Sequence, residues 1–229
     1  MHGVISSAGF GNSGIDQTSL IEDWNPDILS ASAGGVALAS WTSFVSGGHA
    51  LTGTGSAQPL CKTGGPNGHY RVLFDGINDS MAATFTLNQA FTIVLVYKQV
   101  SLHAAGDHNI VFDGKTSDCF LYTDSSKEVA LEAPSAIFRL GQVPADGVYE
   151  TVVCVCNTTT SKINSARVDL ATGNIGTNNP GGFTLGSNRA GVSATNIDVL
   201  RGLIYSGIPG VNFNLTKTQN ALSSLYNVT

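Results

Sequence analysis

The chain has 229 residues, of which 42% are hydrophobic and 12% charged, and its formal net charge is −5 at pH 7. Soluble domains typically contain roughly 25% charged residues, so the polar surface here must consist mainly of Ser, Thr, Asn and Gly. No cluster of Lys or Arg occurs, which argues against nucleic-acid binding. The apolar run Phe91 to Val96 is too short to cross a bilayer, and residues 1–16 lack the features of a secretory signal peptide. We therefore expect a protein made in a cytoplasm that binds neither nucleic acid nor membrane.

The N-terminal segment is rich in Gly, Ser and Asn and has no sustained hydrophobic period between residues 2 and 19. It predicts a flexible arm over residues 1–23, followed by one domain over residues 24–229. An alternative is that the arm becomes ordered on a neighbouring subunit. Its apolar anchors would then be Val4, Ile5, Phe10 and Ile15.

The rest of the chain consists of short β-like runs separated by Gly, Asn, Asp and Pro. The candidate strands are Val36–Phe44, Tyr70–Phe74, Ser80–Leu87, Phe91–Lys98, Asn109–Phe112, Cys119–Thr123, Glu128–Glu132, Ala136–Leu140, Tyr149–Cys156, Ala166–Leu170, Phe183–Leu185 and Val199–Tyr205. Because no helical run separates these strands, the pattern excludes a parallel sheet and predicts an antiparallel two-sheet sandwich. Residues 91–97 place apolar side chains on both faces of the predicted strand, as expected for a central strand covered on each side.

One short helix is predicted over Asn214 to Tyr226, where Leu222, Leu225 and Tyr226 recur at helical spacing. Thr216 and Gln219 have the spacing of a capping box at its start. We expect the helix to pack on the sandwich.

Four cysteines occur, at Cys61, Cys119, Cys154 and Cys156. The C-x-C spacing of the last two matches neither a redox motif nor a zinc site, and on a strand both side chains lie on one face. We predict that they are small core residues. Four N-glycosylation sequons are interpreted as chance products of an Asn- and Thr-rich chain, at Asn78, Asn157, Asn214 and Asn227.

Three segments, taken in order, resemble the laminin-G-like, or concanavalin A-like, jelly-roll superfamily. They are Trp41-Thr-Ser followed by Val72-Leu-Phe-Asp-Gly-Ile-Asn-Asp-Ser-Met81, then Phe91-Thr-Ile-Val-Leu-Val-Tyr97, and then Phe183-Thr-Leu-Gly-Ser-Asn188 with Asp198-Val-Leu-Arg-Gly-Leu-Ile-Tyr-Ser206. The sequence departs from the family pattern in two places: Tyr149 stands where the family often has Trp, and Arg201-Gly202 replaces an acidic residue of the closing strand. The resemblance implies a jelly-roll sandwich.

The sequence contains no recognised catalytic motif. A glycosidase needs two convergent carboxyl groups, whereas Glu128 and Glu132 are interpreted as solvated strand-edge charges. We therefore predict no catalytic residues and no enzymatic activity.

Weaker site candidates are each weighed against a structural role. His103, Asp107 and His108 share a loop but have no metal-site spacing, and no metal site is predicted there. Asp75, Asn78 and Asp79 could bind calcium through oxygen, but turn capping is the preferred interpretation. Four aromatic residues could stack on a sugar, although such residues usually fill a sandwich: Trp24, Trp41, Tyr70 and Tyr122.

Domains that resemble this chain occur in phage and virus virion proteins and in extracellular adhesion modules. This resemblance, the expected cytoplasmic synthesis and the N-terminal arm together favour a non-enzymatic virion surface component. Such a component would be a capsid decoration or head-fibre-type protein, and we expect it to form a homo-oligomer on the particle. Carbohydrate binding through its loops is a further hypothesis, with ligand residues unknown. Two alternatives stay open: a polysaccharide-degrading enzyme with an unrecognised site, and a bacterial adhesion or carbohydrate-binding module.

Overall fold

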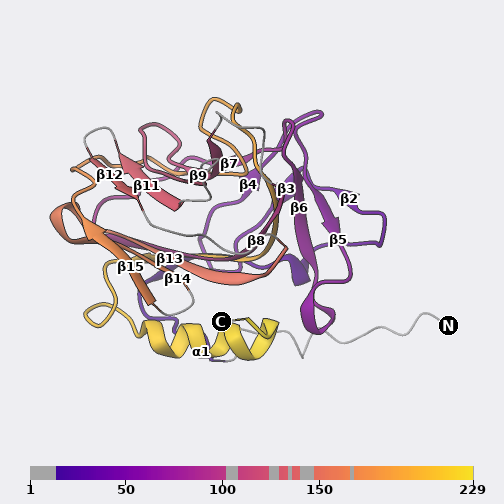
Figure 1. The fold of residues 1–229 in the computed structure, drawn as a ribbon. Coiled ribbons are helices and arrows are strands. Elements are labelled where there is room, and N and C mark those ends of the chain that lie inside the picture. Colours follow the sequence, from indigo (N-terminus) through magenta and orange to yellow (C-terminus); the bar gives the residue numbers. More distant parts are fainter. Residues whose placement is uncertain are drawn as a thin grey trace.

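The computed structural model describes residues 14–101, 108–123, 129–133, 136–139, 147–165 and 168–228. Within these ranges the strands form two antiparallel sheets, one of nine strands and one of eight, that face each other (Figure 1). One α-helix, α1 (Leu215–Tyr226), lies on the outer side of the nine-stranded sheet. This confirms the predicted two-sheet antiparallel sandwich with a short C-terminal helix. No helix of the described residues is long and apolar enough to span a membrane.

The elements of each sheet come from distant parts of the chain. The nine-stranded sheet has the order β15 (Val168–Gly173), β14 (Ser161–Ser165), β13 (Glu150–Cys156), β8 (Phe91–Ser101), β17 (Asn196–Ser206), β6 (Arg71–Asp75), β5 (Leu60–Lys62) and β2 (Val36–Ala37), with β1 (Leu20–Trp24) also paired to β17. The eight-stranded sheet has the order β12 (Ala136–Arg139), β11 (Val129–Ala133), β10 (Phe120–Thr123), β9 (Asn109–Asp113), β16 (Phe183–Leu185), β7 (Met81–Ala83), β4 (Leu51–Thr52) and β3 (Ser40–Trp41). Three short 3-10 helices are η1 (Pro26–Ile28), η2 (Pro66–Gly68) and η3 (Thr158–Thr160).

The two long central strands, β8 and β17, are buried on both faces, and the sequence predicted this for β8 from residues 91–97. Ile93 and Leu95 of β8 face the core between the sheets, while Val94 and Val96 face outward. The outward pair packs in a second apolar cluster with Leu222 of α1. The helix therefore covers the sheet face that the sandwich core does not, which explains why β8 is apolar at consecutive positions.

Large aromatic residues join the two sheets. Trp24 of β1 is 1% exposed, and its ring stacks on Phe183 of β16 with the ring centroids 5.4 Å apart. A Cβ at Gly202 would lie 3.3 Å from the Trp24 ring, so glycine at this position of β17 leaves room for the indole. The Arg201-Gly202 departure from the family pattern thus has a packing reason.

All four cysteines are buried and free, and Cys154 and Cys156 are core residues as predicted. Cys119, Cys154 and Cys156 belong to the core between the sheets. The Cys119 and Cys156 sulfur atoms are 3.9 Å apart, a van der Waals contact between thiols rather than a disulfide.

The predicted arm overlaps the fold. Leu20 to Trp24 form β1, which pairs with β17 beside β6, and Ile15 is 2% exposed in the cluster beneath α1. Residues 14–23 therefore belong to the domain, because their apolar side chains complete the face that α1 covers. Residues 1–13, with Val4, Ile5 and Phe10, lie outside the described residues.

Other differences concern boundaries and caps. The single strand predicted over residues 36–44 is two short strands, β2 and β3, in different sheets. The cap of α1 is Asn214, whose side-chain oxygen accepts the Lys217 N–H at 3.0 Å, so the capping box predicted at Thr216 is wrong. The Gln219 side chain instead donates to Asn164 Oδ1 of β14 at 3.2 Å.

Candidate functional site: an open polar cleft

An open cleft of about 760 Å³ lies over β4 and β7 of the eight-stranded sheet. Leu51 and Met81 of these strands point into the core, so the alternate residues Thr52 and Ala82 face outward and form the floor. The Thr52 hydroxyl donates to the Ala82 carbonyl at 3.2 Å. The walls are lined by residues of several segments: Gly48, His49, Ala50, Gly53, Thr54, Ala57, Asn78, Ser80, Ala83, Thr84, Lys115, Arg189, Ala190 and Gly191. We call this hollow the β4–β7 cleft.

Glycine allows the backbone of one wall to fold tightly. A Cβ at Gly53 would lie 3.0 Å from the Ser80 carbonyl oxygen and 3.1 Å from that of Ala57. These are tighter than ordinary contacts, so a larger residue at position 53 would push the segments apart. The cleft is therefore lined by closely packed, small residues.

His49 stands on the wall in a fixed orientation. Its Nδ1 lies 2.6 Å from Oε1 of the buried Glu22, and its backbone N–H donates to the same carboxylate. The Trp24 indole N–H donates to the His49 carbonyl at 2.9 Å. The His49 imidazole ring stacks on the Phe85 ring, with the ring centroids 4.7 Å apart. Because a carboxylate only accepts, Nδ1 carries the proton, and Nε2 is left to interact with a ligand.

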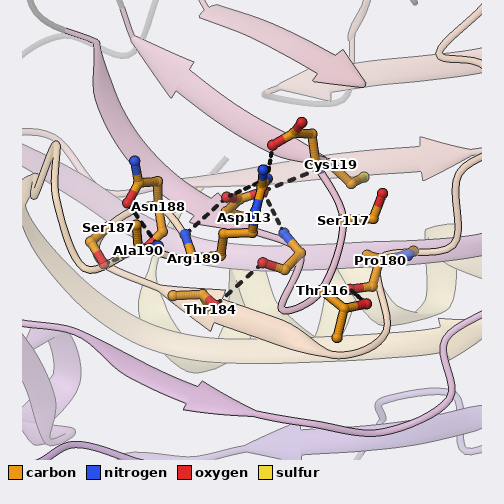
Figure 2. A network of polar contacts seen from close by, with 12 residues as sticks. Asp113, Thr116, Ser117, Cys119, Pro180, Thr184, Ser187, Asn188, Arg189 and Ala190 are labelled. Carbon is orange, nitrogen blue, oxygen red and sulfur yellow. Dashed lines mark hydrogen bonds and ion pairs between the residues drawn. The ribbon is translucent and has the colours of Figure 1, made fainter. Parts of the chain in front are cut away.

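Figure 2 shows the polar network behind the opposite wall, centred on Asp113 at the end of β9. Asp113 is 1% exposed; its Oδ1 accepts the Gly114 and Cys119 N–H groups at 2.7 and 3.2 Å. Its Oδ2 accepts the Arg189 backbone N–H at 2.9 Å. One buried carboxylate thus ties the β9–β10 loop to the β16–β17 loop, and the two loops form one wall.

The same network positions two cations. The Arg189 guanidinium, 37% exposed, forms an ion pair with Asp118, and its Nη1 lies 3.7 Å from Asp113 Oδ2. The backbone N–H groups of Lys115 and Thr116 both donate to the Pro180 carbonyl at 2.9 Å, which fixes the loop that carries the Lys115 side chain. Lys115 is half-buried. Within the described part of the chain, no carboxylate forms an ion pair with it.

The Asp75–Asp79 turn beside the cleft has the capping role that the sequence favoured. Asp75 Oδ1 accepts the Ile77 and Asn78 N–H groups at 2.7 and 3.2 Å, and Asp79 Oδ2 accepts the Asp75 N–H at 2.8 Å. Gly76 has φ +75°. Asn78 lines the cleft and donates to Ser56 Oγ at 3.3 Å. Among the described residues, no group of three or more His, Cys, Asp and Glu side chains is arranged for a metal ion.

The remaining sequence candidates are only partly described by the structure. His103, Asp107 and Glu128 lie outside the described residues. His108 contacts the Tyr122 ring edge-on with centroids 4.2 Å apart, and Glu132 lies half-buried in β11. Of the four aromatic candidates, three are at most 1% exposed and fill the fold, as expected from the alternative interpretation: Trp24, Trp41 and Tyr122. Tyr70 is half-buried, and its N–H donates to Asp27.

Sequence reasoning missed the residues that build the cleft walls. Glu22, His49, Lys115 and Arg189 come from four distant segments, and none belongs to a motif. Asp113 did carry a weak signal, an acidic residue followed by Gly at a strand end, which often caps a turn. Only the tertiary structure shows that Asp113 Oδ2 accepts the Arg189 backbone N–H and so links the β16–β17 loop to the β9–β10 loop.

No family model and no curated protein matches the sequence. Solved structures do match. The Trypanosoma rangeli sialidase in complex with 2,3-difluorosialic acid aligns with TM-score 0.66 and 13% identity over 92% of this chain, which spans 34% of the sialidase. Domain 4 of AbnA, an extracellular GH43 arabinanase from Geobacillus stearothermophilus, in complex with arabinotriose, aligns with TM-score 0.59 and 13% identity over 89% of this chain and 98% of that domain. The fold is a concanavalin A-like β-sandwich. At this identity the likeness is one of fold.

Proposed function

We propose that this concanavalin A-like domain binds carbohydrate in the β4–β7 cleft. The observation that carries the proposal is the cleft itself: it is wide, open and lined by hydroxyl, amide and backbone groups, including Thr52, Asn78 and Ser80. Sugars are recognised through many such hydrogen bonds, and an open cleft admits a chain as well as a single residue. The arabinanase domain of similar fold, whose structure contains arabinotriose, supports the same class of ligand.

We propose binding without turnover. Glycosidases of the usual kind need a carboxylic acid and a carboxylate on either side of the scissile bond. Among the described residues that line the cleft there is no Asp or Glu. The buried Glu22 is committed to His49 and stands behind it, which gives it an orienting role.

The test is saccharide binding to the whole chain, first on a glycan array and then by calorimetry with the best ligand. Thr52→Trp places an indole on the exposed floor and should weaken binding at least about tenfold by occlusion. Thr172→Trp, at an exposed position of β15 in the other sheet, is the matched control and should bind like the parent protein.

Two outcomes would contradict the proposal. One is an array without any bound saccharide; the other is undiminished binding by Thr52→Trp. Reducing-end assays on the same mixtures check turnover, because release of sugar would favour the enzyme alternative.

The location of the domain is a separate proposal that rests on the sequence. We infer a virion surface component from the low content of charged residues and from the N-terminal segment rich in Gly and Ser. Particles purified from cells that make the protein should contain it in stoichiometric amounts. Particles that lack it would exclude this location and leave the binding proposal intact.

A further inference from the structure

The charges of the β4–β7 cleft differ in sign from those of the whole chain. The formal net charge of the chain is −5, yet the charged residues among the described lining of the cleft are Lys115 and Arg189, and its titratable residue is His49. A cleft wall of one sign raises the local concentration of ligands of the opposite sign. Whether this wall attracts an anion depends on which of its cations the neighbouring carboxylates of Asp113 and Asp118 already balance.

Lys115 and Arg189 are not equivalent in this respect. The Arg189 guanidinium already faces Asp118 and Asp113, so its charge is largely balanced within the protein. The half-buried Lys115 ammonium has no carboxylate partner within the described residues. An ammonium group without a carboxylate partner in the protein can form a charge-assisted hydrogen bond with an anionic group of a ligand. Lys115 is thus the cation available to a ligand.

The rest of the lining is suited to more than a simple anion. His49 Nε2 is directed by the Glu22 contact at Nδ1 and can accept a hydrogen bond from a hydroxyl group. Thr52 and Ser80 add hydroxyls on and beside the floor. A ligand with both hydroxyl groups and a negative charge would use the acceptors and the cation together.

We propose that the cleft selects an anionic saccharide, one that carries carboxylate or sulfate groups, and that Lys115 pairs with the anionic group. This inference rests on the proposed carbohydrate binding and specifies its ligand class. Asp113 ties together the loop that carries Lys115 and the loop that carries Arg189. Figure 2 shows Arg189 next to Asp113, and both Lys115 and Arg189 line the cleft.

The experiment compares an acidic and a neutral form of the same saccharide backbone. Oligogalacturonate and its methyl ester are titrated into the full chain by calorimetry, and dextran sulfate and dextran form the second pair. In at least one pair, the affinity of the protein for the acidic member should be at least about tenfold higher than its affinity for the neutral member. Its affinity should fall as the salt concentration rises from about 50 to 500 mM, because exposed charge interactions are screened.

Lys115→Met keeps the apolar stem and removes the charge. It should reduce the affinity for the acidic ligand about tenfold and reduce the affinity for the neutral ligand much less. The matched control is Lys62→Met, at a half-buried lysine of β5 in the other sheet, which should change neither. Near-UV circular dichroism checks that both variants fold; if Lys115→Met does not, Lys115→Gln replaces it.

The outcomes separate this inference from the proposed function. Equal affinity for the charged and neutral members of both pairs, or unchanged acidic binding by the folded Lys115 variant, overturns the anionic specificity and leaves carbohydrate binding standing. No binding of any saccharide overturns both. Preference for oligogalacturonate alone identifies carboxylate as the recognised group, and preference for dextran sulfate alone identifies sulfate.

Discussion

Asp79 illustrates, at the scale of a single residue, how packing changes the chemistry of a turn. Its carboxyl group accepts the Asp75 N–H at 2.8 Å while it lies buried between β6 and β7. Burial raises the pKa of Asp79 to about 6; the hydrogen bond from the Asp75 backbone opposes this rise, and the nearby Asp75 charge adds to it. The folded protein therefore holds this proton more tightly than the unfolded chain does.

The first prediction concerns Asp79→Asn. In the unfolded chain Asp titrates near pH 4, so between about pH 4 and pH 6 the folded state binds more protons and the free energy of unfolding of the parent protein falls as the pH rises. Asparagine can still accept the Asp75 N–H but carries no charge to bury. The variant should thus gain stability relative to the parent protein from pH 4 to pH 7, measured by thermal unfolding at several pH values. A constant difference across this range would contradict the prediction.

The second prediction concerns the thiols. Burial raises the pKa of Cys61 to about 11, with a smaller contribution from the charge of Asp27, and burial raises the pKa of Cys154 and Cys156 well above the ordinary value. The thiolate is the reactive form, so the native protein should resist iodoacetamide at pH 8. Mass spectrometry should find no alkylation of the folded protein under conditions that modify all four cysteines in urea. Rapid alkylation of any one of them in the native state would show that its burial is transient.

Turn residues were the part of the single-residue chemistry that the sequence predicted best. Gly186 directly follows β16 and has φ +86°, a conformation that glycine adopts without strain. A Cβ there would lie 2.2 Å from the Phe74 ring. The turn was predictable from local chemistry, whereas the contact with Phe74 depends on the distant pairing of β6 with β17.

At the scale of elements, α1 shows the limits of a local motif. Thr216 and Gln219 have capping-box spacing, but Asn214 precedes them and accepts the Lys217 N–H. The Asn214 backbone N–H in turn donates to Asp16 Oδ2 at 2.6 Å. This contact with the segment before β1 fixes where the helix begins, and no local pattern contains it.

The third prediction separates these two caps. Asn214→Ala should lower the free energy of unfolding by about 1 kcal/mol, because a backbone N–H of the first turn loses its acceptor. Thr216→Ala should have a smaller effect, and Asn220→Ala, at an exposed position inside α1, should be neutral or slightly stabilising. Urea denaturation measures all three. If Thr216→Ala lowered the free energy of unfolding more than Asn214→Ala, the capping box at Thr216 would be the cap that stabilises the helix.

Three strands that the sequence analysis did not predict, β4, β5 and β14, are short or strongly polar. β4 has two residues, β5 has three, and β14 reads Ser-Lys-Ile-Asn-Ser with one large apolar side chain. Such runs have too few apolar residues to show a period of two. Their neighbours in the sheet stabilise them as strands, through ladders with β7, β6 and β13.

At the scale of the whole molecule, a buried ion pair connects the first strand to the closing strand. Arg201 Nε and Nη2 each donate to Asp23 at 2.7 Å, and both residues are at most 1% exposed. Burial alone would lower the pKa of Arg201, but the charge of Asp23 outweighs this and raises it. Arg201 therefore stays charged in the interior, where Asp23 is its counter-ion.

The fourth prediction tests this dependence. Asp23→Asn should destabilise the protein by about 3–5 kcal/mol, because it leaves the Arg201 charge buried without its counter-ion. The double variant Asp23→Leu with Arg201→Met removes both charges and should recover most of the loss. Urea unfolding of the single and double variants measures the coupling. A double variant no more stable than Asp23→Asn would mean that the pair is required for packing as well as charge.

The sequence by itself determined the fold class, the central strands, the C-terminal helix and the buried thiols. Each depends on a local property, whether the alternation or continuity of apolar residues, the spacing of Leu222, Leu225 and Tyr226, or the small apolar character of cysteine. The cleft was decided by the tertiary structure alone. Its wall residues, such as His49 and Lys115, come from segments that only sheet pairing and the contacts of Glu22 and Asp113 bring together. Polar residues without a period carry no local signal, so their chemistry becomes visible once the backbone has placed them.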